Sequence, residues 1–343
     1  MTKDAVLITG GAGYIGSHAA WACRAAGYPL VVLDDLSKGA RRLVPAEVPF
    51  YEGDVGDSKL LAHIFSRHRV GAVMHFAGAI VVPESMAAPL TYYLTNTCKT
   101  RSLLQSCVDQ GITRFVFSST AAVYGEPDEV PVGEAAPTRP ASPYGASKLM
   151  VEWMLRDVDR AHGLRHVILR YFNVAGADPL GRTGQVTPDA THLIKVACEA
   201  ATGQRPGMEI FGDDYDTPDG TCVRDFIHVS DLAQAHVSAL DHLGSGRESL
   251  TLNCGYGHGY SVREVIEAMQ RAAGTTFPVR IAPRRPGDVR AVISDVSRLR
   301  AAFDWKPAHD SLDEILRTAL AWERTCAAGA RGADATPPHP SWP

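Results

Sequence analysis

The chain has 343 residues, of which 45% are hydrophobic and 21% charged, and this composition excludes wholesale disorder. Thirty-four basic residues against 38 acidic ones give a net charge of −4, which argues against a dedicated binder of nucleic acid or of acidic membranes. No apolar run approaches the ~18 residues that a transmembrane helix needs. The N-terminus enters an apolar run without signal-peptide architecture, so we expect a cytoplasmic protein.

The first half alternates apolar runs with segments of helical spacing. This alternation predicts βαβ units and therefore an α/β fold of the Rossmann type, a doubly wound parallel sheet. Strands buried on both faces explain why these runs are apolar throughout. The predicted strands are Ala5–Thr9, Leu30–Leu33, Ala72–Phe76, Phe115–Ser118 and Val167–Tyr171, and the predicted helices are Ser58–His68, Pro89–Gln110 and Pro143–His162.

The regular alternation ends near Gly176, where a Gly-, Asp- and Pro-rich loop begins. We therefore expect a cofactor-binding domain over residues 1–176, with segments near 225–255 returning to its sheet. Residues 177–326 form mainly a smaller, mixed α/β substrate-binding region that closes with a helix at Ser311–Cys326. Residues 327–343 are rich in Ala, Gly and Pro, which predicts a disordered tail.

Cysteine usage points to a reducing compartment and to no metal centre. The seven cysteines show no Cys-x-x-Cys spacing, which favours free thiols over a zinc site. His236 and His242 have helical spacing but lack a third ligand. His75 is expected to be a core histidine, and His228 and Asp231 are expected to act in capping near the start of a helix. The cysteines are Cys23, Cys98, Cys107, Cys198, Cys222, Cys254 and Cys326.

A glycine-rich loop follows the first predicted strand and opens a helix. Gly10, Gly13 and Gly16 leave room for a tight turn, for a pyrophosphate and for close packing of helix on strand. The amide groups at the helix start then face the phosphates. Asp34 ends the second strand, where a carboxylate accepts from an adenosine ribose and repels a 2′-phosphate. NAD is thus favoured over NADP, although Lys38 keeps NADP as the alternative.

A phenol and an ammonium group lie one helical turn apart in Tyr144-Gly145-Ala146-Ser147-Lys148. Ser118-Ser119-Thr120 ends the preceding strand and can point a hydroxyl into the same cleft. A free phenol has a pKa near ~10 and is a poor base at neutral pH. Lowering that pKa by ~3 units requires about 4 kcal/mol, which the Lys148 charge and an oxidised nicotinamide can supply together.

With these motifs in place, the sequence resembles the extended, sugar-nucleotide-modifying branch of the short-chain dehydrogenases/reductases. Within that branch it resembles the UDP-glucose 4-epimerase family over roughly residues 4–325. The matching segments are Gly10–Gly16, Asp54-Val55, His75–Ala77, Ser118–Gly125, Tyr144–Lys148, Tyr171–Asn173, Phe211–Val229 and Arg284–Asp288. The resemblance implies reversible interconversion of UDP-glucose and UDP-galactose through a 4-keto sugar with bound NAD.

The resemblance assigns the catalytic roles to Tyr144, Lys148 and Thr120. Tyr144 would be the acid/base at the sugar 4-hydroxyl, Lys148 would bind the nicotinamide ribose, and Thr120 would hydrogen-bond the same sugar oxygen. The residues that follow, Ala121 to Val123, carry no carboxylic acid to protonate a leaving 6-hydroxyl. Dehydration is therefore disfavoured.

The same resemblance places the cofactor and the substrate on two sets of residues. The NAD set is Gly10, Gly13, Tyr14, Ile15, Gly16, Asp34, Asp35, Leu36, Ser37, Lys38, Gly39, Asp54, Val55, Phe76, Ala77, Gly78, Thr95, Asn96, Tyr144, Lys148 and Phe172. The UDP-sugar set is Thr120, Tyr144, Asn173, His192, Leu193, Glu209, Ile210, Phe211, Arg224, Phe226, Arg285, Asp288 and Val292. Fork-shaped guanidinium donors at Arg224 and Arg285 suit a diphosphate, with surface ion pairing, for example of Arg224 with Asp225, as the alternative.

Several positions depart from the family pattern. His192 replaces an Asn, Phe226 a Tyr, Lys195 a Pro, Ile80 a Lys and Thr95 an Asn found in relatives. Val292 stands where a tyrosine accompanies restriction to plain hexoses, so N-acetylated sugars are expected to fit. The alternative is that Val292 only begins a buried strand.

Two further functions stay open, and one partner is expected. The first alternative is 4-epimerisation of another UDP sugar, such as UDP-N-acetylglucosamine, UDP-glucuronate or UDP-xylose. The second is a cofactor-binding protein that has lost the chemistry, although both Tyr144 and Lys148 are present. An apolar stripe of Leu149, Met150, Trp153 and Met154 beside the catalytic pair predicts, with the family, a homodimer.

Overall fold

A computed structural model of the chain describes residues 4–187, 190–285 and 288–333. The predicted tail beyond residue 333, residues 286–287 of the Arg284–Asp288 motif and the first three residues of the predicted cofactor domain lie outside the described residues. Within those ranges, no helix has both the length and the apolar character to span a membrane.

The core of the structure is a seven-stranded sheet in which every neighbouring pair is parallel. Its order is β11-β6-β5-β4-β1-β2-β3. The chain thus winds outward from β1 in both directions, so the predicted doubly wound sheet is confirmed. The strands are β1 (Ala5–Thr9), β2 (Leu30–Asp34), β3 (Phe50–Glu52), β4 (Val70–His75), β5 (Arg114–Thr120), β6 (Arg165–Tyr171) and β11 (Leu250–Cys254).

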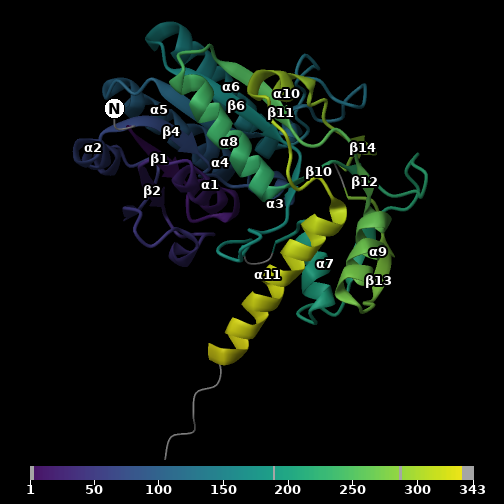
Figure 1. Cartoon of the computed structure of the whole chain (residues 1–343). Coiled ribbons are helices and arrows are strands. Elements are labelled where there is room, and N and C mark those ends of the chain that lie inside the picture. The colour runs from purple at the N-terminus through teal and green to yellow at the C-terminus, as the bar shows by residue number, and fades with distance from the viewer. Residues whose placement is uncertain (1–3, 188–189, 286–287, 334–343) are drawn as a thin grey trace, which may run out of the picture.

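Two layers of helices cover this sheet (Figure 1), and each forms its own apolar core. Helices α1 (Tyr14–Ala25) and α8 (Val229–Gly244) bury their apolar faces on one side, with α10 (Ser297–Phe303) beside α8. Helices α2 (Ser58–Arg67), α5 (Lys99–Asp109) and α6 (Pro143–His162) cover the other side. The remaining short helices are η1 (Arg41–Leu43), α3 (Val82–Ala87), α4 (Pro89–Tyr92), η2 (Tyr93–Cys98) and η3 (Ala121–Val123).

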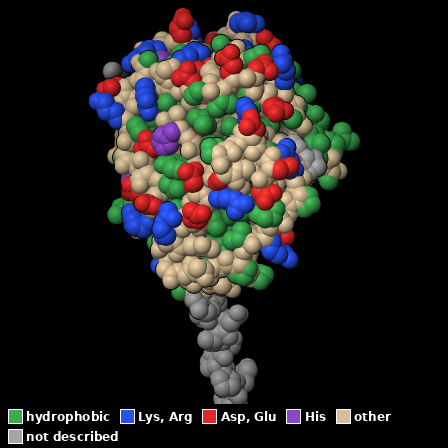
Figure 2. Space-filling model, turned by 90° about the vertical axis from the view of Figure 1, so that its right-hand side faces the viewer, with side chains coloured by type: hydrophobic (Ala, Val, Ile, Leu, Met, Phe, Trp, Pro, Cys, Tyr) green, Lys and Arg blue, Asp and Glu red, His purple; other side chains and the backbone are tan. Residues whose placement is uncertain are grey.

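A smaller region lies over the carboxyl ends of the strands. Helices α7 (Leu193–Ala201), α9 (Val262–Ala273) and α11 (Leu312–Ala333) pack together there (Figure 1). Three small sheets accompany them, pairing β7 (Asn173–Ala175) with β10 (Phe226–His228), β8 (Met208–Phe211) with β13 (Val279–Ala282), and β9 (Val223–Arg224) with both β12 (Tyr260–Ser261) and β14 (Ala291–Val292). On the face in Figure 2, basic and acidic side chains are interspersed rather than segregated.

Two sequence-based predictions need correction. The predicted tail begins at Ala327, but α11 continues to Ala333, because alanine has the highest helix propensity of all residues and extends the helix. The single helix predicted at Pro89–Gln110 contains a π-helical stretch at Tyr93–Cys98. Such stretches are often found at functional sites, and this one carries Thr95 and Asn96.

Candidate active site

One cavity of about 2030 Å³ runs along the carboxyl ends of the strands. It is lined both by the glycine loop after β1 and by residues of the small sheets, so the two predicted halves of the site meet in it. All but three of the predicted site residues line this cavity. The exceptions are Leu36, Asn96 and Ile210.

Asn96 points into the protein because its amide is occupied there. Its side-chain oxygen accepts from the Ala79 amide at 2.8 Å, and its nitrogen donates to the Ala79 carbonyl and to the Ser147 hydroxyl, each at 3.0 Å. Thr95, its neighbour, lines the cavity instead. Asn96 therefore holds the loop after β4 against α6, and the prediction that it faces the cofactor is not supported by this geometry.

The glycine loop has the shape that a pyrophosphate needs. Gly10 has φ +70, and a Cβ there would lie 2.5 Å from the Ala77 nitrogen; a Cβ at Gly16 would lie 2.1 Å from the Gly10 oxygen. Only glycine fits either position. Gly13 is the N-cap of α1 and has no side chain to cap the first amides, so the amide groups at the helix start are left for an anionic group. These residues fit a dinucleotide.

Asp34 ends β2 beside this loop, as predicted. Its carboxylate accepts from the Ala12 amide at 2.9 Å and from the Leu36 amide at 2.8 Å. Burial raises the pKa of Asp34, and these two amide bonds oppose that rise. The carboxylate is thus fixed between the glycine loop and the turn after β2, where an adenosine ribose would lie.

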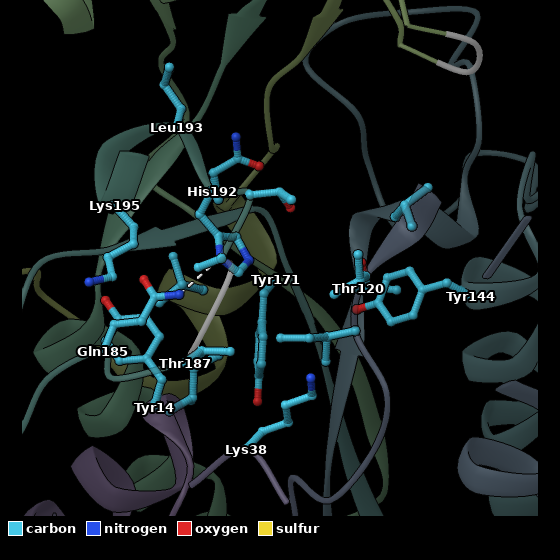
Figure 3. A pocket seen from close by; sticks show the side chains of 18 of the residues that line it. Tyr14, Lys38, Thr120, Tyr144, Tyr171, Gln185, Thr187, His192, Leu193 and Lys195 are labelled. Carbon is cyan, nitrogen blue, oxygen red and sulfur yellow. Dashed lines mark hydrogen bonds between the residues drawn. The ribbon is translucent and has the colours of Figure 1, made fainter. Parts of the chain in front are cut away.

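Helix α6 brings the two ends of the Tyr144–Lys148 pair to the cavity. The Ser142 hydroxyl caps the helix by accepting from the Gly145 amide at 3.2 Å, Pro143 starts it, and Gly163 ends it in the left-handed conformation. The Tyr144 ring points at Thr120 at the end of β5 (Figure 3). Lys148 donates to the Ser118 carbonyl at 3.1 Å.

Burial dominates the protonation of this pair. It raises the pKa of the Tyr144 phenol, which the Thr120 hydrogen bond opposes, and it lowers the pKa of Lys148 to about 8. In the chain without cofactor, burial therefore outweighs the influence of Thr120 on the phenol. A further positive charge in the cavity is needed to form phenolate.

Of the two predicted diphosphate ligands, Arg224 lies on a small sheet and Arg285 lies in the segment after β13. Arg224 on β9 is 3.6 Å from Asp288, rather than paired with Asp225, whose carboxylate accepts from Ser294 and from backbone amides. The Arg285 guanidinium lies 3.5 Å from the centroid of the Phe211 ring. Val292 pairs in register with Arg224 and lines the cavity, so its side chain adjoins the expected phosphate ligand.

Two of the departures from the family pattern have local partners. The Gln185 amide donates to Nδ1 of His192 at 3.0 Å (Figure 3). Lys195 lines the cavity, and its ammonium lies 3.1 Å from Glu199 and donates to Glu323 on α11. Lys195 thus ties α7 to the C-terminal helix, and much of its charge is balanced by these carboxylates.

The histidines outside the cavity have the structural roles expected from the sequence. His75 lies between the Thr9 and Thr100 hydroxyls at 2.7 Å on each side, and His228 caps α8 by accepting from the Ser230 amide. All seven cysteines lie within the described residues, and none of them forms a disulfide bond. Among the described residues, no group of three His, Cys, Asp or Glu side chains could hold a metal ion.

Sequence reasoning did not identify two polar groups beside the site. Tyr171 lines the cavity, and its hydroxyl is hydrogen-bonded to Nε2 of His236. Burial lowers the pKa of His236 to about 4 and keeps the ring neutral. Because Nδ1 donates to the Leu232 carbonyl, Nε2 is the acceptor for the Tyr171 hydroxyl. Glu152 and Arg170 form a buried ion pair behind β5. The only sequence signal for the Glu152–Arg170 pair is that Glu152 lies one helical turn after Lys148.

A model of the NAD dependent epimerase/dehydratase family matches residues 6–255. The chain belongs to this family. The cofactor predicted from the glycine loop and Asp34 is the one on which the family depends.

Individual members of the family match almost the whole chain. The UDP-glucose 4-epimerase of Azospirillum brasilense is 59% identical over 336 residues, or 96% of this chain and 97% of the relative. The structure of the UDP-Glc/GlcNAc 4-epimerase from Campylobacter jejuni is 48% identical with a TM-score of 0.83, covering 94% of this chain and 100% of that one. The Bifidobacterium longum UDP-glucose 4-epimerase, solved with NAD⁺ and UDP, is 39% identical with a TM-score of 0.90, covering 95% and 99%.

Proposed function

We propose that this chain interconverts UDP-glucose and UDP-galactose by inverting C4 of the hexose through a transient 4-keto sugar. The observation that carries the proposal is that Tyr144, which faces Thr120, lines one cavity with Arg224, Arg285 and the glycine loop. The high identity of its relatives named UDP-glucose 4-epimerase supports the same reaction.

Tyr144 is the acid/base of this reaction. Its phenolate takes the proton of the sugar 4-hydroxyl while the C4 hydrogen leaves as hydride, and the phenol returns the proton when hydride is delivered to the opposite face of the ketone. Bound NAD supplies the hydride acceptor and donor, and its positive charge offsets the burial that raises the phenol pKa. Thr120 holds the same sugar oxygen, and Lys148 holds the nicotinamide ribose.

The remaining predicted residues position the two ligands. Gly10, Gly13 and Gly16 hold the pyrophosphate of NAD, and Asp34 holds its adenosine ribose. On the other side, Arg224 and Arg285 bind the substrate diphosphate, Phe211 packs on the base and Asp288 accepts from ribose hydroxyls. On this basis, we assign the large sheet to the cofactor and the small sheets to the substrate.

Hydride exchange is favoured over dehydration. The wall of the cavity just after Thr120 is formed by Ala121 and Ala122, so no carboxylic acid follows Thr120 to protonate a leaving 6-hydroxyl. The 4-keto sugar then has no route to elimination through this strand. The remaining course for the 4-keto sugar is rotation about its diphosphate link, followed by return of the hydride.

A second candidate is epimerisation of UDP-N-acetylglucosamine by the same site. Val292 is the observation that favours it, because a valine leaves more room at the sugar than a tyrosine would. The Campylobacter jejuni relative named for both sugars fits this reading. The two activities are compatible, and initial rates on both substrates separate a hexose-only enzyme from a broader one.

Incubation of the purified protein with UDP-galactose, without added NAD, tests the main proposal. We expect UDP-glucose to form and the mixture to reach the same ratio of the two sugars from either side. Addition of NAD should change little if the cofactor is retained. A protein that releases NAD on denaturation but converts neither sugar would contradict the proposal.

We also propose a homodimer in the cytosol. Exposed apolar side chains gather on α3, α4, η2 and α6, which pack against one another: Met86 is 59% exposed, Leu90 80%, Leu94 57% and Trp153 51%. Of the predicted stripe only Trp153 is exposed, since Leu149 is buried and Met150 and Met154 are partly buried. Light scattering should give twice the chain mass, and Leu94→Glu should give monomers. A monomeric wild type would contradict this assembly.

A further inference from the structure

A buried polar network lies behind the strand that carries Thr120, and the proton and hydride steps do not use it. Glu152 on α6 is 0% exposed and Arg170 on β6 is 2% exposed. Arg170 donates to both carboxylate oxygens of Glu152, at 2.6 and 3.0 Å. Such a two-pronged, charge-assisted contact fixes both distance and angle between its partners.

One end of the network joins the two elements that carry the reacting hydroxyls. The Ser119 hydroxyl donates to Glu152 at 2.6 Å. Ser119 is the neighbour of Thr120 on β5, and both residues line the cavity, so the contact fixes β5 directly beside the residue that faces Tyr144. Glu152 follows Lys148 by one helical turn and Tyr144 by two. The contact therefore fixes α6 against β5.

The other end reaches toward the sugar side of the cavity. Arg170 donates to the Tyr124 hydroxyl at 2.8 Å, which donates to Asn253 on β11 at 2.7 Å. The Asn253 amide donates to the Val132 carbonyl at 2.7 Å. The Val132 amide donates to the carbonyl of Ile293 at 2.8 Å, and Ile293 follows Val292. A continuous series of hydrogen bonds thus connects the catalytic helix with the strand beside the expected sugar.

We propose that Glu152 and Arg170 are positioning residues that hold Tyr144 and Lys148 in register with Thr120 for the C4 chemistry. The inference rests on the proposed function. A buried ion pair is weak evidence for a stability role, because well-packed apolar residues often replace one without loss of stability. However, an apolar pair cannot fix the orientation of α6 relative to the strands that it packs against. A shift of ~1 Å between reacting groups can cost about 100-fold in rate, which makes orientation the stronger reason for this pair.

The main test replaces the pair by apolar residues in the full chain with bound NAD. In Glu152→Leu/Arg170→Met we expect kcat to fall about 10- to 100-fold, while KM for UDP-galactose, bound NAD and the melting temperature stay close to wild type. The matched control, Asp178→Asn/Arg182→Gln, removes an ion pair of 2.7 Å outside the cavity lining. This control should lower the melting temperature but leave kcat unchanged.

The pH profile gives a readout that a merely structural role would not move. Tyr144 faces Thr120 on β5, Lys148 on its own helix, Tyr171 on β6 and the Tyr92 ring on α4 at 6.5 Å. Loosening α6 from β5 moves the phenol away from the Thr120 hydroxyl, which opposes the rise in the phenol pKa. Less phenolate is then present at a given pH, so the acidic limb of kcat should move to higher pH in the double variant.

Ser119→Ala is the second variant and decides the question if the double variant does not fold. It removes only the contact between β5 and Glu152 and leaves the ion pair intact, so we expect a several-fold fall in kcat at unchanged KM. Wild-type kcat in the folded variants, or losses that follow KM or NAD content, would overturn the inference. A wild type that converts neither sugar would instead overturn the proposed function, and this inference with it.

Discussion

The two walls of the cavity are built from elements of very different length. Tyr144 and Lys148 lie on a 20-residue helix and Thr120 on a seven-residue strand of the large sheet. Arg224 and Val292 lie on strands of two residues each, and Phe211 on one of four. The first wall is fixed by long-range packing, whereas the second is held by short ladders and loops. The chemistry therefore lies on the rigid wall, and the choice of sugar lies on the wall that tolerates change.

The largest expected effect comes from the rigid wall. Tyr144→Phe deletes the group that moves the proton and removes little volume, so we expect turnover to fall by about 10²- to 10⁴-fold while NAD stays bound. The measurement is the rate of conversion of UDP-galactose, with cofactor content determined after denaturation. Thr120→Ala serves as the comparison and should be milder. Full activity in Tyr144→Phe would show that another group transfers the proton.

The buried Lys148 on the first wall should make the unfolding free energy depend on pH. Burial lowers the pKa of Lys148 to about 8 in the folded chain, against about 10.4 in an unfolded one. Between these values the unfolded chain binds more protons, so stability should rise with pH. Lys148→Met removes this dependence. The difference in unfolding free energy between NAD-free wild type and variant should change by on the order of 3 kcal/mol across that window.

Urea titrations at pH 7 and pH 10.5 measure this difference. Lys306→Met provides the control, because the Lys306 side chain is 83% exposed and its removal should not alter the pH dependence. A difference between wild type and Lys148→Met that stays constant with pH would show that Lys148 keeps its ordinary pKa in the fold.

The rigid wall is also the part that the sequence predicts best. Helix α6 begins and ends at the residues predicted, because Ser142, Pro143 and Gly163 are local signals that need no tertiary partner. Asn96 and the network around Glu152 could not be predicted in this way. The orientation of the Asn96 amide depends on Ala79 and Ser147, and that of Glu152 depends on Ser119 and Arg170, all brought near by folding. The stack of Arg285 on Phe211 is equally non-local.

The second wall should accept substitution with a change in substrate breadth rather than loss of chemistry. Val292→Tyr places a large ring beside Arg224, where overpacking against a C2 N-acetyl group costs about 1–3 kcal/mol, or one to two decades in rate. The activity on UDP-N-acetylglucosamine should therefore fall more than the activity on UDP-glucose. Val292→Ile is the conservative control. A wild type inactive on the N-acetyl sugar would show that other side chains limit the pocket.

The smallest effect is expected at the far end of the first wall, where Asp34 sets the choice of cofactor. The carboxylate that accepts from the Ala12 and Leu36 amides would repel a 2′-phosphate, and Lys38 lines the cavity nearby. In Asp34→Asn the repulsion is lost while the ammonium remains, so discrimination against NADP should fall about tenfold, or ~1.4 kcal/mol. Binding titrations with NAD and NADP measure the ratio. Asp109→Asn, at an exposed residue at the end of α5 outside the cavity lining, should leave it unchanged. Purified wild type carrying NADP would show that Lys38, rather than Asp34, determines which cofactor binds.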